Sequence, residues 1–317
     1  MKPQSQEQNI LEIKRLKAEK NAIILAHYYQ TGDIQDIADF VGDSLALSQK
    51  ASSNSADIII FAGVKFMAET AKILAPEKKV LLPDINAGCS LADSCKAEDF
   101  ENFIKQNPGR TVVSYVNTSA EIKALSDIIC TSSNAVQIVE SLPANEKILF
   151  APDRNLGNYV LNKTGRDMVI WDGTCHVHRE FSLEAIINLK NNHPGAKIIV
   201  HPECELPVRM VADFIGSTSS LLQFTKKDKG NCYIVATEAG IIHQMKKENP
   251  GKTYIPAPPI DSTCGCSECG FMKLITVEKI LNCIKNETPE IVIDRETLIK
   301  AQKPIRRMIE ISEKLGL

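Results

Sequence analysis

The sequence predicts an α/β protein: three homologous three-layer αβα domains, each with a four-stranded parallel sheet, arranged with pseudo-threefold symmetry around a central cavity. Three observations lead to this fold class. A pattern of apolar and amphipathic segments occurs three times along the 317 residues. The spacing within the pattern is the same each time. Its apolar segments are short and rich in β-branched residues, which is typical of parallel strands buried on both faces.

Each repeat begins with an apolar run that predicts the first strand of a sheet. The three runs start the segments 23–30, 112–119 and 198–205, which align without gaps. Equivalent strand-end positions hold His27, Tyr115 and His201, so the unit repeats after 88 residues and then after 86.

A second apolar run and a hydroxyl side chain follow the first strand at fixed distances. The run begins at an aspartate, and the hydroxyl lies 17 residues after the strand-end position. The aspartates are Asp39, Asp127 and Asp213, and the hydroxyl residues are Ser44, Ser132 and Thr218. Strand–helix units often look alike, but equal spacings that end on hydroxyl groups favour a true repeat over coincidence.

Two further strands complete each predicted sheet, separated by helix-like stretches that imply right-handed parallel connections. The third strands are expected at 57–62, 147–151 and 233–236, and the fourth at 79–82, 168–171 and 253–255. The predicted domains are residues 1–88, 89–174 and 175–290. The remaining segment, 291–317, holds a helix at about 297–315 that is expected to pack back on the first domain.

The carboxyl ends of the strands predict where the site lies, because ligands of parallel α/β sheets bind there. Side chains that can bind or transfer protons follow the first strands. They are His27, Tyr29, Tyr115, Asn117, His201 and Glu203. The hydroxyl residues Ser44, Ser132 and Thr218 come where helices should begin, so we expect them to cap these helices. Three converging helix N-termini would suit an anion with several carboxylates or a phosphate.

Cysteine follows the fourth strand of every repeat. The first two are Cys89 and Cys175, and the third repeat offers Cys264, Cys266 and Cys269. Ten cysteines in a chain without secretory features favour metal binding over a disulfide framework. Three thiolates suit a [4Fe–4S] cluster whose fourth iron is not bound by protein. Zinc bound by three cysteines is the alternative, and the spacing does not separate the two.

The composition argues against several classes of partner. Hydrophobic residues make up 44% and charged residues 24% of the chain, the balance of a soluble globular protein. A net charge of −2 and scattered basic residues favour neither a nucleic acid nor an acidic membrane surface. The N-terminus lacks the apolar core of a signal peptide, and no apolar run approaches about 18 residues. We therefore expect a cytoplasmic protein with no nucleic-acid or membrane partner.

At these residues the chain resembles the quinolinate synthases, iron–sulfur enzymes of de novo NAD biosynthesis, over nearly its full length. The motifs are specific in combination. They lie at 24–30, 37–44, 66–71, 82–90, 115–119, 201–203 and 269–272.

The resemblance implies a transferase that condenses iminoaspartate with dihydroxyacetone phosphate to quinolinate, phosphate and water, with a [4Fe–4S] cluster as Lewis acid. It also implies a transient contact with the L-aspartate oxidase that supplies iminoaspartate. Carried over residue by residue, it makes Cys89, Cys175 and Cys269 the cluster ligands. It implies that the catalytic residues are Tyr29, His178, His201 and Glu203. It implies that the substrate is bound by His27, Ser44, Tyr115, Asn117, Ser132, His201, Glu203 and Thr218.

Some alternatives stay open at this point. The internal repeat aligns Cys175 with Cys264, whereas the family pattern favours Cys269, which we follow as the third ligand. Cys266 and Cys269 could form a reversible disulfide that disables the cluster. A zinc-dependent lyase or aldolase on the same cavity is a competing function. An iron–sulfur redox sensor is another, although the charge distribution offers no partner surface for it.

Overall fold

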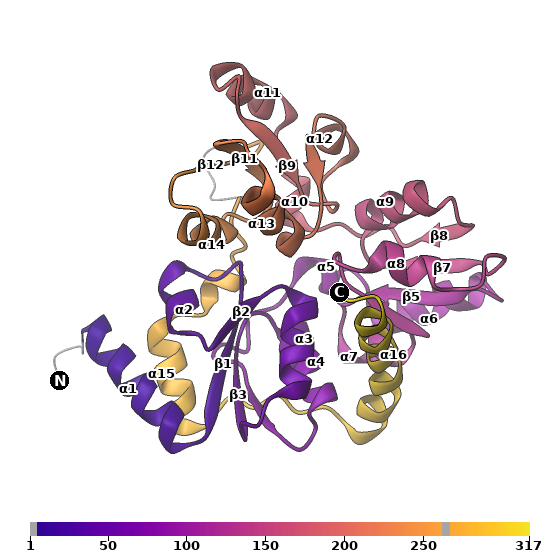
Figure 1. The fold of residues 1–317 in the computed structure, drawn as a ribbon. Helices are drawn as coiled ribbons and strands as arrows, with labels where there is room; N and C mark the ends of the chain where they lie inside the picture. The colour runs from indigo at the N-terminus through magenta and orange to yellow at the C-terminus, as the bar shows by residue number, and fades with distance from the viewer. Residues whose placement is uncertain (1–4, 262–266) are drawn as a thin grey trace.

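The structure is a computed structural model that describes residues 5–261 and 267–317. Its elements fall into three lobes, each built around one sheet (Figure 1). The first lobe comprises α1 (Gln6–Glu19), β1 (Ala22–His27), α2 (Gly32–Ile37), β2 (Phe40–Gly42), α3 (Ser44–Ser53), β3 (Ile58–Ala62), α4 (Lys65–Leu74) and β4 (Lys79–Leu81). The second comprises α5 (Ser90–Asp93), α6 (Ala97–Gln106), β5 (Thr111–Tyr115), α7 (Ala120–Ala124), β6 (Ile128–Cys130), α8 (Ala135–Glu140), β7 (Ile148–Ala151), α9 (Arg154–Thr164) and β8 (Met168–Ile170). The third comprises α10 (His176–Arg179), α11 (Leu183–Asn192), β9 (Lys197–Val200), α12 (Leu206–Met210), β10 (Phe214–Ile215), α13 (Thr218–Lys227), β11 (Cys232–Ala236), α14 (Ile241–Glu248) and β12 (Thr253–Pro256).

All three sheets share one strand order and are parallel throughout. The orders are β2-β1-β3-β4, β6-β5-β7-β8 and β10-β9-β11-β12. The register is equivalent as well, since Leu25 pairs with Phe40, Val113 with Ile128 and Ile199 with Phe214. The predicted α/β fold with three four-stranded parallel sheets is confirmed. The third and fourth strands begin and end within one residue of their predicted positions.

An aspartate joins the first two strands of every sheet in the same way. Its Oδ2 atom accepts a hydrogen bond from a backbone N–H of the first strand, and its own N–H donates to the carbonyl of that same residue. The carboxylate distances are 2.7 Å for Asp39 to Ile24, 2.8 Å for Asp127 to Val112 and 2.7 Å for Asp213 to Ile198. The sequence repeat at these aspartates is therefore a structural repeat, because each one fixes where the second strand lies against the first.

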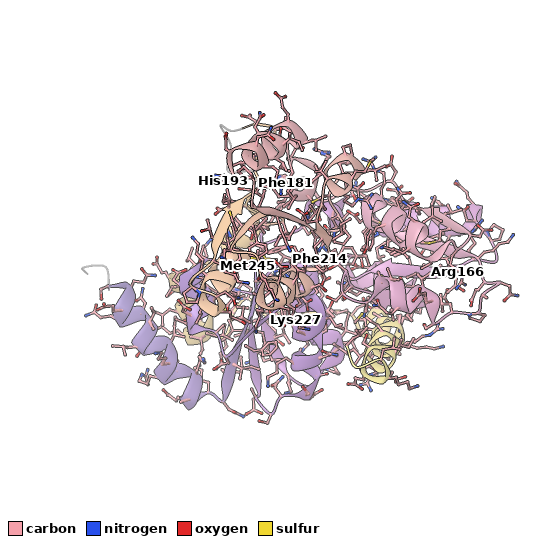
Figure 2. All side chains as sticks on the ribbon, turned by 45° about the horizontal axis from the view of Figure 1, so that its top comes forward. Arg166, Phe181, His193, Phe214, Lys227 and Met245 are labelled. Atoms are coloured by element: carbon pink, nitrogen blue, oxygen red, sulfur yellow. The ribbon has the colours of Figure 1, made fainter. Side chains whose placement is uncertain are left out.

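The apolar core is distributed unevenly among the lobes. Buried side chains of the first lobe and of one face of the second sheet form one continuous cluster, and the other face of the second sheet packs against a separate cluster. The two faces of the third sheet pack against separate clusters. In the third lobe Phe214 stacks on Phe224 with ring centroids 4.3 Å apart, and Met245 of α14 is fully buried (Figure 2). The consequence is that the first two lobes share a hydrophobic interior in which the third takes little part.

The chain leaves the third lobe and returns to the other two through a short 3₁₀ turn (Met272–Leu274), α15 (Val277–Asn286) and α16 (Arg295–Lys314). Helix α15 packs against α1 and β3 of the first lobe, so the predicted 175–290 domain includes a helix that lies on the first sheet. Helix α16 contacts α7 and β6 of the second lobe and also α4 of the first (Figure 1). Among the residues described, no helix combines the length and the apolar character needed to span a membrane.

Candidate active site

One cavity lies where the carboxyl ends of the three sets of strands meet. It has an empty volume of about 630 Å³ and takes lining residues from all three lobes. Every residue predicted for the site lines it: His27, Tyr29, Ser44, Cys89, Tyr115, Asn117, Ser132, Cys175, His178, His201, Glu203, Thr218 and Cys269. The structure thus brings the predicted residues together, although it does not by itself assign their roles. Polar lining residues that the sequence did not predict are Asp43, Thr131 and Glu238.

The N-cap positions predicted for Ser44, Ser132 and Thr218 are occupied by other residues. Asp43 caps α3 and Ser217 caps α13, each through a side-chain oxygen that accepts a backbone N–H of the first turn. Ser44 and Thr218 are therefore the first residues of these helices, and Ser132 lies two residues before the N-cap of α8. The prediction that the three residues are caps is wrong: Ser44 and Thr218 follow a residue that already supplies the acceptor, and the N-cap of α8 is Asn134, two residues after Ser132. Their hydroxyl groups are left to line the cavity.

A hydrogen-bonded junction joins the three helix starts. Ser133 Oγ donates to Asp43 Oδ2 at 2.6 Å and lies 2.8 Å from Ser217 Oγ. Each of these residues comes from a different lobe. Ser133 and Asp43 also line a second, more open hollow beside α3 and α13. The junction therefore separates the buried cavity from the surface on that side.

The two histidines at equivalent strand ends have equivalent surroundings. His27 Nδ1 accepts the backbone N–H of Tyr29 at 3.2 Å, and His201 Nδ1 accepts that of Glu203 at 3.3 Å. These bonds leave the ring proton on Nε2. Burial lowers the pKa of His27 to about 4 and that of His201 to about 3. Both imidazoles are therefore neutral donors near pH 7.

Glu203 is the buried carboxylate at the centre of the site. Its Oε1 accepts a hydrogen bond from the Tyr115 hydroxyl at 2.5 Å, and its Oε2 lies 3.1 Å from His178 Nδ1. Burial favours the neutral acid, but His178 and the hydrogen bond from the Tyr115 hydroxyl outweigh burial and lower the pKa of Glu203 below its usual value. The His178 ring stacks on that of His201 with centroids 4.5 Å apart. The arrangement provides one ionised carboxylate, which can accept a proton, among hydrogen-bond donors.

Tyr29 reaches from the first lobe into the third. Its hydroxyl lies 2.9 Å from Thr218 Oγ1 and 2.8 Å from Thr237 Oγ1. Thr237 Oγ1 is also 2.9 Å from His178 Nε2, so it links the phenol to the imidazole. Burial, and then the charge of Glu203, raise the pKa of Tyr29, so the phenol keeps its proton. The sequence reasoning missed Thr237, although it directly follows β11 and the strand-end rule applied to third strands would have found it.

The three predicted ligand cysteines lie in this cavity as free thiols. Cys89 precedes α5, Cys175 precedes α10, and Cys269 lies between the third sheet and α15. Burial, together with the proximity of Cys269, raises the pKa of Cys89 to about 12. Burial also raises the pKa of Cys175 and Cys269. Cys264 and Cys266 lie outside the described residues, so the alternative ligand and the reversible disulfide stay predictions.

This donor set fits an iron–sulfur cluster. Three thiols from distant parts of the chain face one space, and none of them is in a disulfide. Their raised pKa values mean that a strong positive charge is needed to hold them as thiolates, and cluster iron supplies such charge. Cys89, Cys175 and Cys269 are therefore suited to bind a cluster and leave one iron without a protein thiolate.

A buried carboxylate that the sequence reasoning missed supports the third cysteine. Glu238 is completely buried, and its Oε1 accepts the backbone N–H of Cys269 at 3.1 Å. Its Oε2 accepts the N–H of Gly240 at 2.7 Å. Lys273 Nζ lies 2.8 Å from Oε1 and donates to the carbonyl of Tyr29, also at 2.8 Å. No sequence signal distinguished Glu238 from other acidic residues near strand ends.

Comparisons with known proteins agree with this picture. Residues 11–310 match the profile of the family described as Quinolinate synthetase A protein. A relative from Microcystis aeruginosa named quinolinate synthase is 60% identical over 300 residues, which cover 95% of this chain and 94% of the relative. Proteins of the same name from Thermosynechococcus vestitus (57% over 303 residues, 96% and 95%) and Chloroherpeton thalassium (55% over 302 residues, 95% and 94%) are also similar. The chain belongs to the quinolinate synthetase A family.

Proposed function

We propose that this chain is a quinolinate synthase that condenses iminoaspartate with dihydroxyacetone phosphate. The products are quinolinate, phosphate and two molecules of water. The proposed cofactor is a [4Fe–4S] cluster bound by Cys89, Cys175 and Cys269. The observation that carries the proposal is that one cavity collects these three thiols together with a buried ionised carboxylate and neutral imidazoles.

The polar lining suits substrates that carry carboxylates and a phosphate. The hydroxyl groups of Ser44 and Thr218 come from the first turns of α3 and α13, where backbone N–H groups and the helix dipole favour negative charge. Ser132 and Asn117 add further polar groups from the second lobe. The neutral imidazole of His27 donates from Nε2 without adding a charge. The three lobes can therefore each bind part of one anionic substrate.

Condensation with loss of two waters needs groups that accept and return protons. Glu203 is ionised and can take a proton from carbon or nitrogen. Tyr29 is protonated and can donate to a leaving oxygen, and Thr237 orients its hydroxyl beside His178. His201 keeps Glu203 in place by the hydrogen bond from the Glu203 backbone and by stacking on His178. A bound cluster would supply Lewis-acid chemistry toward substrate oxygens through its iron that no cysteine binds.

The test is anaerobic purification followed by an assay for quinolinate. Chain with a reconstituted cluster is mixed with dihydroxyacetone phosphate and with iminoaspartate generated in place from oxaloacetate and ammonia. We expect quinolinate and phosphate to appear in equal amounts, and Cys89→Ser to abolish both. A cluster-loaded chain that makes no quinolinate would contradict the proposal. A chain that cleaves its substrate with one bound zinc and no iron would instead support a zinc-dependent lyase.

The proposal extends to the supply of substrate. Iminoaspartate hydrolyses readily in water, so we propose that the chain works in the cytoplasm beside the L-aspartate oxidase that produces it. A transient contact is sufficient for this transfer. Coupled assays at falling enzyme concentration would detect it, because free diffusion would lose more iminoaspartate to hydrolysis at each dilution.

A further inference from the structure

Three side chains of different chemistry converge on one wall of the cavity. They are a thiol, an imidazole and a carboxylate, from Cys175, His178 and Glu203, and their ligand atoms all lie within 4.8 Å of one another. We propose that in the chain without a cluster these three residues bind a single divalent transition-metal cation such as Zn²⁺. The donor set differs from the three thiols of the proposed cluster site, with which it shares only Cys175.

The geometry is close to that of a tetrahedral metal site. His178 Nδ1 lies 3.2 Å from Cys175 Sγ and 3.1 Å from Glu203 Oε2. Metal–ligand bonds of about 2.0–2.3 Å in a tetrahedral shell separate neighbouring ligand atoms by about 3.3–3.8 Å. The two distances from Nδ1 are therefore a few tenths of an ångström short of such a shell, and the remaining pair of ligand atoms lies within 4.8 Å. The fourth position would face the cavity, as in zinc sites with three protein ligands.

Neighbouring groups already hold two of the ligands in the orientation that the metal requires. The second ring nitrogen of His178, Nε2, lies 2.9 Å from Thr237 Oγ1, which leaves Nδ1 toward the thiol. Glu203 Oε1 accepts the Tyr115 hydroxyl, which leaves Oε2 toward His178. Metal-binding imidazoles and carboxylates usually have such outer partners. His178 and Glu203 are both nearly inaccessible to solvent, so water does not compete with the cation there.

The charge of the site matches one dication. A thiolate and a carboxylate carry two negative charges, and the imidazole is a neutral ligand. A divalent cation neutralises this set, which without the cation carries one negative charge, on Glu203, while the thiol keeps its proton. Binding therefore releases the thiol proton to solvent, and the mixed sulfur, nitrogen and oxygen donors suit Zn²⁺, Co²⁺ and Fe²⁺ over Mg²⁺ or Ca²⁺.

A cation at this site and the proposed cluster exclude one another, because both need Cys175 Sγ. This step rests on the proposed function, whereas cation binding itself does not. The cluster-free chain would thus be held in an inactive metal-bound form, and preloading with Zn²⁺ would slow cluster assembly.

The test uses Co²⁺, whose thiolate charge-transfer absorption reports how many thiolates are bound. Cluster-free full-length chain is titrated without oxygen. We expect one equivalent to bind, with the absorption of a single thiolate and visible bands of tetrahedral cobalt. Cys175→Ser should remove the charge-transfer band, and His178→Ala and Glu203→Gln should each weaken binding at least tenfold. Cys89→Ser and Cys269→Ser are matched controls from the same cavity and should bind Co²⁺ like the unchanged chain.

Other outcomes separate the possibilities. A charge-transfer band that falls by equal steps in all three cysteine variants would show a three-thiolate site and overturn the proposal. Binding that survives Cys175→Ser unchanged would overturn it as well. Circular dichroism on every variant identifies any that fail to fold. If another variant of the site fails to fold, the conservative Glu203→Gln change tests the proposal in its place. Failure of this experiment leaves quinolinate formation by the cluster-loaded chain unaffected, so the two proposals fail separately.

Discussion

The Nζ atom of Lys273 lies 2.8 Å from Oε1 of Glu238, a carboxylate that is completely buried. The same carboxylate oxygen accepts the backbone N–H of Cys269, and the same ammonium donates to the carbonyl of Tyr29. One ion pair therefore connects the segment of the third proposed cluster ligand with the segment of Tyr29. Burial raises the pKa of Glu238, and Lys273 opposes that effect.

Replacing Lys273 by Met should loosen the segment of Cys269. The change leaves a buried carboxylate without its cation, which costs about 3 kcal/mol in folding free energy. We expect the cluster of Lys273→Met to lose iron to a chelator several times faster than that of the unchanged chain under anaerobic conditions. Lys300→Met is the control, because Lys300 pairs with Glu296 on the exposed face of α16. Equal rates of iron loss in both variants would show that the ion pair does not position Cys269.

Thr237→Val should impair catalysis without disturbing the fold. Valine keeps the shape of the buried threonine but removes the hydroxyl that links Tyr29 to His178. We expect quinolinate formation to fall by about 10- to 100-fold, the usual scale for a misplaced proton donor. Thr237→Ser should restore most of the rate. Thr225→Val removes an equally buried hydroxyl that lies in α13 and outside the cavity, where it donates to the carbonyl of Leu222, and it should leave the rate unchanged.

The buried imidazoles predict a loss of stability in acid. The folded pKa values of His27 and His201, about 4 and about 3, lie below the value of an unfolded histidine. Between roughly pH 6.5 and pH 4 the unfolded chain therefore binds more protons than the folded chain. The free energy of unfolding should fall with falling pH by up to about 1.4 kcal/mol per pH unit for each histidine.

Urea unfolding of the cluster-free chain at about pH 7 and about pH 5 measures this effect. His201→Gln should lose less stability between the two pH values than the unchanged chain, and comparison of variants cancels the contribution of other groups. His193→Gln is the control variant, because His193 is exposed at the end of α11 (Figure 2). A pH dependence that is identical in His201→Gln and the unchanged chain would contradict the assignment of a neutral buried His201.

Single replacements of Cys89, Cys175 or Cys269 by Ala should abolish the visible absorption and the iron content of the reconstituted chain. Cys283→Ala is the matched control, since this buried thiol lies in α15 and away from the cavity. Cys264→Ala, outside the described residues, should retain the cluster. Retention by Cys269→Ala together with loss by Cys264→Ala would show that the internal repeat, and not the family pattern, identifies the third ligand.

Periodicity and spacing were sufficient to predict the three sheets. Buried parallel strands occur in the sequence as short apolar runs, and the polar residues between these runs mark where each strand ends. The strand-end rule then placed His27 and His201 at one cavity together with Ser44. These predictions depend on local sequence and on the order of the elements along the chain. Both can be recognised because the same unit occurs three times.

The sequence could not show which groups face each other across lobes. Glu238 and Lys273 are 35 positions apart, and Thr237 contacts Tyr29 over more than two hundred residues. The helix caps were assigned one residue too late, because Ser44 and Thr218 each follow a residue that caps better. Helix α15 was placed with the wrong lobe, since amphipathicity shows that a helix has a buried face but not which sheet covers it.

The uneven distribution of the apolar core has a mechanical consequence. The first and second lobes would have to expose hydrophobic surface to water if they separated, and this is costly. The third lobe meets the first through polar contacts in the part of the chain described, such as Gln35 with Gly240 and Asp36 with His243, and through Tyr28, which packs against one of its apolar clusters. Its own core is not continuous with the core of the other two lobes. We therefore expect the molecule to open most easily between the third lobe and the other two, along a plane that passes through the cavity.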